Sequence, residues 1–226
     1  MDALHAASAR LAGTLQAGPP WLEKFWISVT SFADPKGIFT VCFPLAYSLD
    51  RYVGLSLLWT GLLAEWLNVV LKWFFFGERP FWWIHESGLT RTEPLALRQF
   101  SVSCETGPGD PSGHCMVTGA ALWPIVAALT ELASAHSRRL AVKLMPFVAY
   151  ALFLLAVGLS RIFVLAHFPH QVVGGILAGI ALGWGLQAHA PVAHTPAFFV
   201  ATALALLLGS LALRSLILAA GIDIDW

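Results

Sequence analysis

Long apolar runs, each close to the length of a bilayer crossing, follow one another along most of the chain and are separated by polar segments. A transmembrane helix needs about 20 predominantly apolar residues. The first such run contains Asp34-Pro35-Lys36-Gly37, which should kink or break a helix. The predicted spans are residues 25–47, 53–76, 115–132, 144–159, 170–186 and 197–220. The pattern therefore predicts an all-α fold, a polytopic bundle of about six transmembrane helices forming one domain over residues 1–226.

Two polar loops between the spans should lie on the same side of the membrane. They are residues 77–113, after the second span, and residues 160–169, after the fourth. Because two spans separate them, both loops emerge on one face. The short segment 136–143 between the third and fourth spans carries two arginines and a lysine. Basic loops favour the cytoplasmic side, so the two polar loops should face away from the cytoplasm.

The composition agrees with a membrane protein. Apolar residues make up 58% of the chain and charged residues 12%, about half the fraction of about 25% that is usual for globular domains. The formal net charge is zero, which argues against a nucleic-acid-binding protein. The three cysteines, Cys42, Cys104 and Cys115, form no CxxC pair and are too few for a disulfide framework.

Polar residues at helical spacing interrupt the second span. Glu65, Asn68 and Lys72 follow an i, i+3, i+7 pattern and should share one helix face. A structural ion pair between Glu65 and Lys72 is one interpretation. If the helix continues to Pro80, Arg79 lies about 10 Å, or two turns, beyond Lys72 on the same face. Two cations would then line a cavity at the membrane surface.

The third span opens on a second polar cluster. Ser112 is a good N-cap residue, and Gly113 and His114 follow it. The free N–H groups of a helix start bind anions readily. An ordinary capped helix with a solvated histidine explains the same residues equally well.

The third polar cluster lies between the fourth and fifth spans. Arg161 follows a long apolar run, and His167 precedes Pro169, which suits the first turn of the fifth span. His167 alone could be an interfacial residue. Taken together, the clusters bring three cations and two imidazoles to one membrane face. Such a set suits a dianion such as phosphate, which arginine binds through several donors and lysine as a point charge.

Three motifs carry a resemblance to a known superfamily. Lys72-x6-Arg79-Pro80, Pro111-Ser112-Gly113-His114 and Ser160-Arg161-x5-His167 resemble the signature motifs of the type 2 phosphatidic acid phosphatases. The segment Cys104–Gly109 and the glutamine at 171 more closely resemble the glucose-6-phosphatase catalytic subunits, and other flanking residues resemble the third isoform of that family. Members of that family have nine spans, so the chain is short at its C-terminal end.

The resemblance implies a fold and a chemistry. The fold is the helical core shared with vanadium haloperoxidases, and the reaction is hydrolysis of a sugar 6-phosphate through a phosphohistidine. By position, His167 resembles the nucleophile and His114 the proton donor. Neighbouring cations would help to keep the nucleophile neutral. The residues expected to bind the phosphate are Lys72, Arg79, Arg161, Ser112 and Gly113.

The resemblance also implies a cellular location and partners. The chain would lie in the endoplasmic reticulum membrane with its site in the lumen, functionally coupled to a glucose-6-phosphate transporter. The long loop contains no tight carboxylate cluster, so neither a metal nor another cofactor is expected. Partners would be the sugar phosphate and the lipid bilayer, without nucleic acid.

Several alternatives stay open. A lipid phosphate phosphatase of the same superfamily would share the catalytic residues, and a truncated membrane protein without catalytic activity would explain the short chain. An intramembrane serine protease would use Ser112 and His114. The aromatic run 81–83 is either an anchor at the membrane interface or a contact for the sugar.

Overall fold

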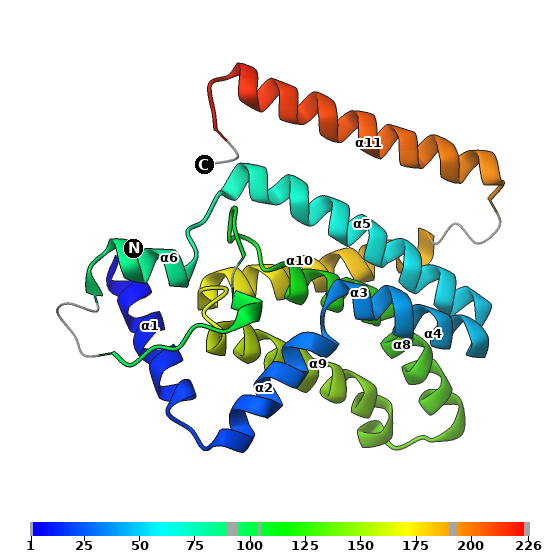
Figure 1. The fold of residues 1–226 in the computed structure, drawn as a ribbon. Helices are drawn as coiled ribbons and strands as arrows, with labels where there is room; N and C mark the ends of the chain where they lie inside the picture. Colours follow the sequence, from blue (N-terminus) through cyan, green and yellow to red (C-terminus); the bar gives the residue numbers. More distant parts are fainter. Residues whose placement is uncertain (1, 90–94, 104, 190–193, 224–226) are drawn as a thin grey trace.

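The computed structural model describes residues 2–89, 95–103, 105–189 and 194–223; Cys104 lies outside these ranges. The described residues form helices joined by loops and contain no strand, which confirms the predicted all-α class (Figure 1). The α-helices are α1 (Asp2–Gln16), α2 (Pro20–Phe32), α3 (Pro35–Gly37), α4 (Phe43–Leu49), α5 (Arg51–Phe75), α6 (Pro80–Glu86), α8 (Gly113–His136), α9 (Leu140–Phe163), α10 (Pro169–Leu186) and α11 (Pro196–Ala219). A π-helical turn, η1 (Ile38–Cys42), and two 3-10 turns, η2 (Ser101–Ser103) and η3 (Gln187–His189), complete the set.

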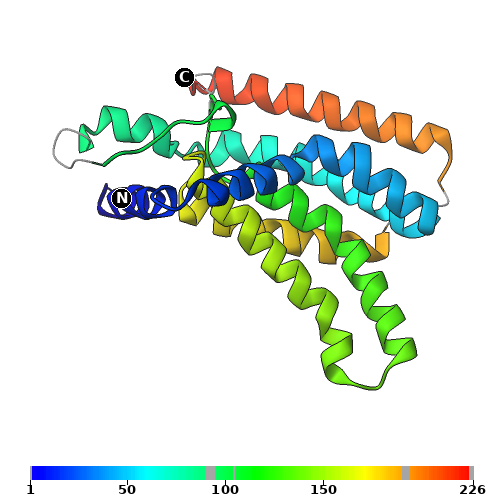
Figure 2. The same ribbon diagram turned by 60° about the horizontal axis from the view of Figure 1, so that its bottom comes forward.

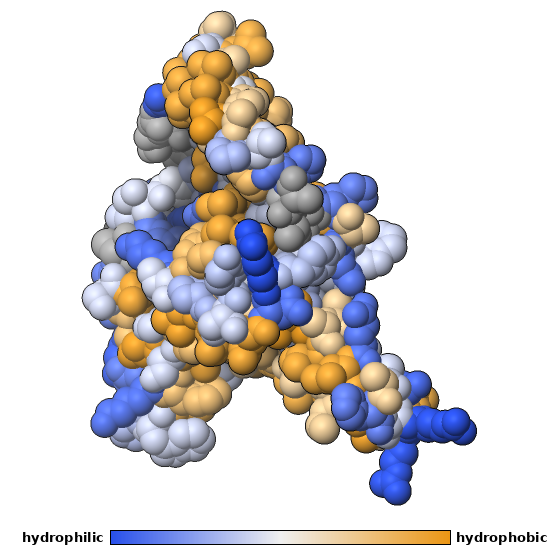
Figure 3. Space-filling view, turned by 90° about the vertical axis from the view of Figure 1, so that its right-hand side faces the viewer, coloured by the Kyte–Doolittle hydropathy of each residue, from blue (hydrophilic) through white to orange (hydrophobic). Residues whose placement is uncertain are grey.

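Five helical segments are long and apolar enough to cross a membrane. They are Arg51–Glu86, which comprises α5 and α6, Gly113–His136, Leu140–Phe163, Pro169–His189, which comprises α10 and η3, and Pro196–Ala219. The chain is therefore a multi-pass membrane protein. Apolar residues cover much of the surface seen in Figure 3, as expected for a molecule whose surroundings are partly lipid.

The first predicted span, residues 25–47, is not one continuous helix but is broken at Asp34-Pro35-Lys36-Gly37, where the sequence predicts a kink or break. α2 ends at Phe32, and Asp34 caps the next helix by accepting a hydrogen bond from the Lys36 N–H at 2.8 Å. Pro35 has no N–H to donate to the preceding turn. The chain therefore restarts as three short helical pieces, α3, η1 and α4.

α8 lies at the centre of the bundle and packs against α5, α9 and α10. Gly175, Gly179 and Gly183 repeat every four residues along α10 and face α8. A Cβ atom at Gly179 would lie 2.4 Å from the Met116 carbonyl oxygen, so only glycine permits this separation of the two backbones. The sequence pattern predicts such close packing through small residues, and the structure confirms it. Tyr150 ties α9 to α8 by donating to the Gly119 carbonyl at 2.6 Å.

α8 and α9 form an antiparallel hairpin whose turn lies far from the loops at the other end of the bundle (Figure 2). α11 runs along α5 on the outside of the molecule (Figures 1 and 2), and Ile217 is its one buried residue. Trp66 of α5 donates to the Ser210 hydroxyl of α11 at 2.7 Å.

Candidate active site

Four helix ends and two loops meet at one end of the bundle. They are the C-terminal ends of α5 and α9, the N-terminal ends of α8 and α10, and the loops after α6 and α9 (Figures 1 and 2). The loop residues 77–113 and 160–169 are in direct contact, since Arg79 donates to the Ala166 carbonyl at 3.2 Å. The two polar loops therefore lie together at one end of the bundle.

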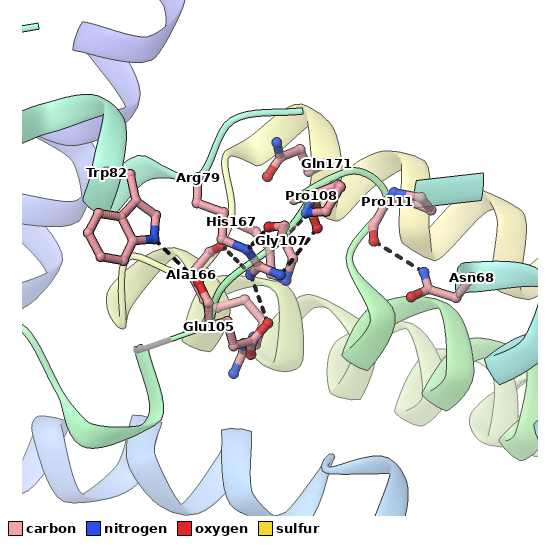
Figure 4. A network of polar contacts seen from close by, with 12 residues as sticks. Asn68, Arg79, Trp82, Glu105, Gly107, Pro108, Pro111, Ala166, His167 and Gln171 are labelled. Atoms are coloured by element: carbon pink, nitrogen blue, oxygen red, sulfur yellow. Dashed lines mark hydrogen bonds and ion pairs between the residues drawn. The ribbon is translucent and has the colours of Figure 1, made fainter. Parts of the chain in front are cut away.

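Arg79 is buried and held by four hydrogen bonds (Figure 4). Its Nε donates to the Gly107 carbonyl at 2.8 Å, and the terminal nitrogens donate to the Pro108 and Ala166 carbonyls, each at 3.2 Å. The fourth bond, 2.7 Å long, goes to the Glu105 carboxylate. These bonds fix the guanidinium in one orientation.

The sequence pattern places Arg79 on a continuation of the second span's helix. In the structure Arg79 instead occupies the N-cap of α6. α5 ends at Phe75 because Phe76 and Gly77 both adopt positive φ angles, 57° and 58°. Glycine reaches this region freely and other residues at a cost. The backbone reverses there and carries Arg79 over the bundle end.

Arg161 lies in the last turn of α9 and is fully buried. One terminal nitrogen donates to the Thr30 hydroxyl of α2 at 2.8 Å, and the other pairs with Glu105. Its Nε is buried without a hydrogen-bond partner among the described residues.

Glu105 joins the two arginines, with one carboxylate oxygen on each. Figure 4 shows its contact with Arg79. Burial alone would raise the pKa of this carboxyl, but the charges of Arg161 and Arg79 outweigh it and lower the pKa to about 2. Glu105 is therefore ionised at neutral pH. Sequence reasoning did not select Glu105, and its only signal was its place in the segment Cys104–Gly109.

His167 is fully buried in the turn between α9 and α10. Its Nδ1 lies 2.8 Å from the Gly109 carbonyl oxygen, which can only accept, so Nδ1 carries the proton and Nε2 has the free lone pair. Burial and the neighbouring charges of Arg161, Arg79 and Lys72 hold the pKa of His167 well below its usual range. The imidazole is neutral at physiological pH, and its Nε2 is a potential nucleophile.

His114, in the first turn of α8, opens into a cavity. The cavity has a volume of about 360 Å³, within the range of about 300–1,000 Å³ typical of small-molecule sites. Glu105 and Arg161 line it together with polar residues that the break after α2 places there, Thr30, Ser31, Asp34 and Lys36. The break in the first predicted span thus supplies polar lining to the cavity that His114 borders.

Ser112 and Gly113 lie at the start of α8. Ser112 occupies the N-cap position, but its hydroxyl makes no capping bond, contrary to prediction, and its N–H donates to the Gln171 carbonyl at 3.1 Å. Gly113 begins the helix, so its N–H has no acceptor inside the helix. A Cβ at Gly113 would lie 3.0 Å from the Asn68 side-chain oxygen of α5, which explains why glycine occupies this position.

Lys72 lies in the last turn of α5 and is partly exposed. Within the described part of the chain no ion pair joins Lys72 to Glu65, so the structural pair considered above does not form. Lys72 instead belongs to the set of cations whose charges act on His167.

Gln171 fastens two of the loops to α10. Its side-chain oxygen accepts from the Phe168 N–H at 3.1 Å, and its side-chain nitrogen donates to the Glu78 carbonyl at 2.7 Å. Gln171 thus bonds to the loops, whereas the His167 ring donates its hydrogen bond to the Gly109 carbonyl. The Gly109 N–H in turn donates to the Phe76 and Gly77 carbonyls. Sequence reasoning did not identify this backbone partner.

Sequence comparisons relate the chain to known proteins. The model of the PAP2 superfamily matches residues 53–195. The chain is 50% identical over its whole length to glucose-6-phosphatase 3 of Mus musculus and 49% identical to that of Homo sapiens. It is 37% identical to glucose-6-phosphatase catalytic subunit 1 of Canis lupus familiaris over 80% of the chain and 52% of that protein.

A solved structure shares the fold. It is the crystal structure of the first transmembrane PAP2 type phosphatidylglycerolphosphate phosphatase from Bacillus subtilis, which matches with a TM-score of 0.62 and 20% identity. The match covers 83% of this chain and 86% of that one.

The chain belongs to the PAP2 superfamily. Within it, the predicted similarity to the glucose-6-phosphatases, and to the third isoform in particular, is confirmed. The chain spans 65% of the length of the glucose-6-phosphatase 3 proteins that it matches.

Proposed function

We propose that this chain hydrolyses sugar 6-phosphates, glucose 6-phosphate and close analogues, to the free sugar and inorganic phosphate. The observation that carries the proposal is the state of His167. Its Nδ1 proton is bonded to Gly109, its pKa is lowered, and its environment holds Arg79 and Arg161. A neutral imidazole among fixed cations is what nucleophilic attack on a phosphate dianion requires.

The reaction has two steps. In the first, Nε2 of His167 attacks phosphorus while the bond from phosphorus to the sugar oxygen breaks and His114 protonates that oxygen. In the second, His114 takes a proton from water, the resulting hydroxide attacks phosphorus, and phosphate leaves His167. Lys72, Arg79 and Arg161 stabilise the charge on the phosphoryl oxygens, with N–H groups at Ser112 and Gly113 nearby. Every role falls to the chain itself, without a metal or other cofactor.

A polar leaving group fits the site better than a lipid. The cavity beside His114 is lined by hydroxyl, carboxylate and ammonium groups of Thr30, Asp34 and Lys36. These groups hydrogen-bond to sugar hydroxyls, whereas an acyl chain would leave them unpaired, which is costly. A serine protease is disfavoured because the Ser112 hydroxyl has no hydrogen-bond partner among the described residues, so no base is in place to activate it. A lipid phosphate phosphatase and a non-catalytic membrane protein are the alternatives that experiment must separate.

The proposed location is the endoplasmic reticulum membrane with the site facing the lumen. The basic turn between α8 and α9 lies at the opposite end of the bundle from the site (Figure 2), which supports this orientation by the positive-inside rule. A lumenal site receives a charged sugar phosphate only after transport across the membrane. Functional coupling to a glucose-6-phosphate transporter follows from that requirement.

The test is phosphate release by membranes that contain the chain, with glucose 6-phosphate and phosphatidic acid compared as substrates. We expect release from the sugar phosphate, none from a His167→Ala variant, and an acid-labile phosphoryl group on the wild-type chain. Preferential hydrolysis of phosphatidic acid would favour the lipid alternative. Equal inactivity of wild type and His167→Ala, beside an active mouse relative, would show that this chain is not an enzyme.

A further inference from the structure

We propose that Glu105 is a displaceable carboxylate that occupies the phosphate site between Arg79 and Arg161 until a substrate dianion replaces it. This proposal rests on the proposed function, because it takes the two arginines as the groups that bind phosphate. It adds a residue that sets how tightly the site binds an anion.

The carboxylate already occupies the position that an anion would take. Its two oxygens pair with the terminal nitrogens of Arg79 and Arg161, one oxygen on each. Carboxylate and phosphate are both recognised by guanidinium groups through parallel charge-assisted bonds. Among the described residues, no other acidic side chain forms an ion pair with either arginine.

The arginines cannot move to meet a substrate elsewhere. Arg79 donates to three backbone carbonyls besides Glu105, and Arg161 is held by Thr30. Their side chains are 4% and 1% exposed. An incoming phosphate must therefore come to the arginines, and Glu105 must give way.

Glu105 has the freedom that the arginines lack. Its side chain is 32% exposed and borders the cavity of about 360 Å³ in front of His114. Its backbone is anchored, because its N–H donates to the Ser103 carbonyl and its carbonyl accepts from Trp82. The carboxylate can thus rotate into the cavity while the loop stays in place.

The carboxylate also leaves one donor unused. The Nε of Arg161 is buried and has no acceptor among the described residues. A buried charged donor without a partner is costly. A phosphate has more oxygens and a larger negative charge than a carboxylate, so it can satisfy this donor as well and compete with Glu105 for the site.

The exchange has two consequences. In the empty site Glu105 neutralises two buried guanidinium groups that would otherwise repel each other. During binding Glu105 competes with the substrate. The apparent dissociation constant is therefore the intrinsic dissociation constant divided by the fraction of molecules in which Glu105 has left the arginines. A dianion overcomes this competition, whereas an uncharged sugar cannot.

The test measures binding of inorganic phosphate to the purified 226-residue chain in detergent, comparing wild type with Glu105→Gln. We expect the variant to bind phosphate about tenfold more tightly, because glutamine has no charge to compete for the arginines. We also expect a lower melting temperature without phosphate and a larger rise when phosphate is added. Unchanged or weaker phosphate binding by a folded Glu105→Gln chain overturns the proposal.

Glu23→Gln is the matched control. Glu23 pairs with Arg98 at 2.7 Å, and its side chain is 31% exposed, close to the value for Glu105, but it lies outside the site. Its loss should leave phosphate affinity unchanged. If Glu105→Gln does not fold, Glu105→Asp keeps the charge on a shorter side chain that cannot span both arginines, and its phosphate affinity should still exceed that of wild type.

Measuring phosphate binding and hydrolysis separately distinguishes a failure of the exchange proposal from a failure of the proposed function. Tighter phosphate binding by Glu105→Gln without any hydrolysis by wild type would support the exchange and reject the proposed function. Hydrolysis by wild type with no change in phosphate affinity in either Glu105 variant would support the function and reject the exchange.

Discussion

The Gly109 carbonyl oxygen lies 2.8 Å from Nδ1 of His167 and decides which ring nitrogen carries the proton. Gly109 is held in turn by N–H bonds to the carbonyls of Phe76 and Gly77. A Cβ at Gly109 would lie 2.9 Å from the Glu78 carbonyl oxygen, so only glycine fits. The tautomer of the proposed nucleophile is thus set by the backbone of the loop that also carries Glu105.

The buried neutral state of His167 predicts a loss of stability in mild acid. Its pKa is lowered in the folded state, so the unfolded chain binds the extra proton below about pH 6.5, and unfolding becomes easier as the pH falls. The cost is about 1.4 kcal/mol for each pH unit below that value. His167→Gln should therefore lose less stability than wild type between pH 7 and pH 5 in thermal unfolding experiments.

The control for this measurement is His136→Gln, since His136 is exposed at the end of α8. That variant should show the wild-type pH dependence. Glu105 acts in a different window: its pKa is lowered to about 2, so the stability that it contributes is lost only below about pH 4.5. A His167→Gln slope equal to wild type would contradict the neutral buried imidazole.

Thr30 supports the orientation of Arg161 and provides a second prediction. Its buried hydroxyl accepts from the Arg161 guanidinium at 2.8 Å. Thr30→Val keeps the shape but leaves a charged donor without a partner, which should lower the free energy of unfolding by about 1–3 kcal/mol. Thr40→Val is the control, because the Thr40 hydroxyl is exposed and donates to the Lys36 carbonyl of the preceding turn. Thermal unfolding of both variants with phosphate absent checks the prediction, and equal effects would contradict it.

The long helices and the charged site residues could be predicted from the sequence, because apolar length and motif spacing are local properties. Arg79, Arg161 and His167 lie together as expected. The route by which Arg79 arrives there was not predictable, since it depends on positive φ angles at Phe76 and Gly77 rather than on continued helix. The spacing of residues along a helix predicts their positions only while the backbone stays helical, and the helix ends at this reversal.

Glu105 and the polar cavity wall could not be predicted for a related reason. Glu105 is a single charge in a loop without periodicity, and its role appears only when the loop passes between two arginines. The helix break at Asp34 was expected, but its effect was not, because only the packing of α2 beside α9 brings Thr30 and Asp34 to the cavity.

The contact between α8 and α10 yields a third prediction. A Cβ at Gly179 would lie 2.4 Å from the backbone oxygen of Met116, which cannot move aside as a flexible side chain would. Gly179→Ala should therefore force the helices apart at a cost of about 1–3 kcal/mol and lower the melting temperature. Gly185→Ala in the same helix meets nothing within 4 Å and should leave stability unchanged or raise it slightly. Equal melting temperatures for the two variants would contradict the tight contact.

The polar cavity wall leads to a fourth prediction, which separates binding of the sugar from binding of the phosphate. Asp34 lines the cavity beside His114, and its carboxylate also caps α3 through the Lys36 N–H. Asp34→Asn keeps a capping side chain, since asparagine caps helices as well as aspartate does. It removes the charged acceptor available to sugar hydroxyls, so KM for glucose 6-phosphate should rise about tenfold, equivalent to about 1.4 kcal/mol. With an aryl phosphate, which has no such hydroxyls, KM should stay near the wild-type value. Steady-state kinetics on both substrates provide the check: a parallel rise in KM would mean that Asp34 acts on the phosphate site, and no rise with either would remove it from the sugar contacts.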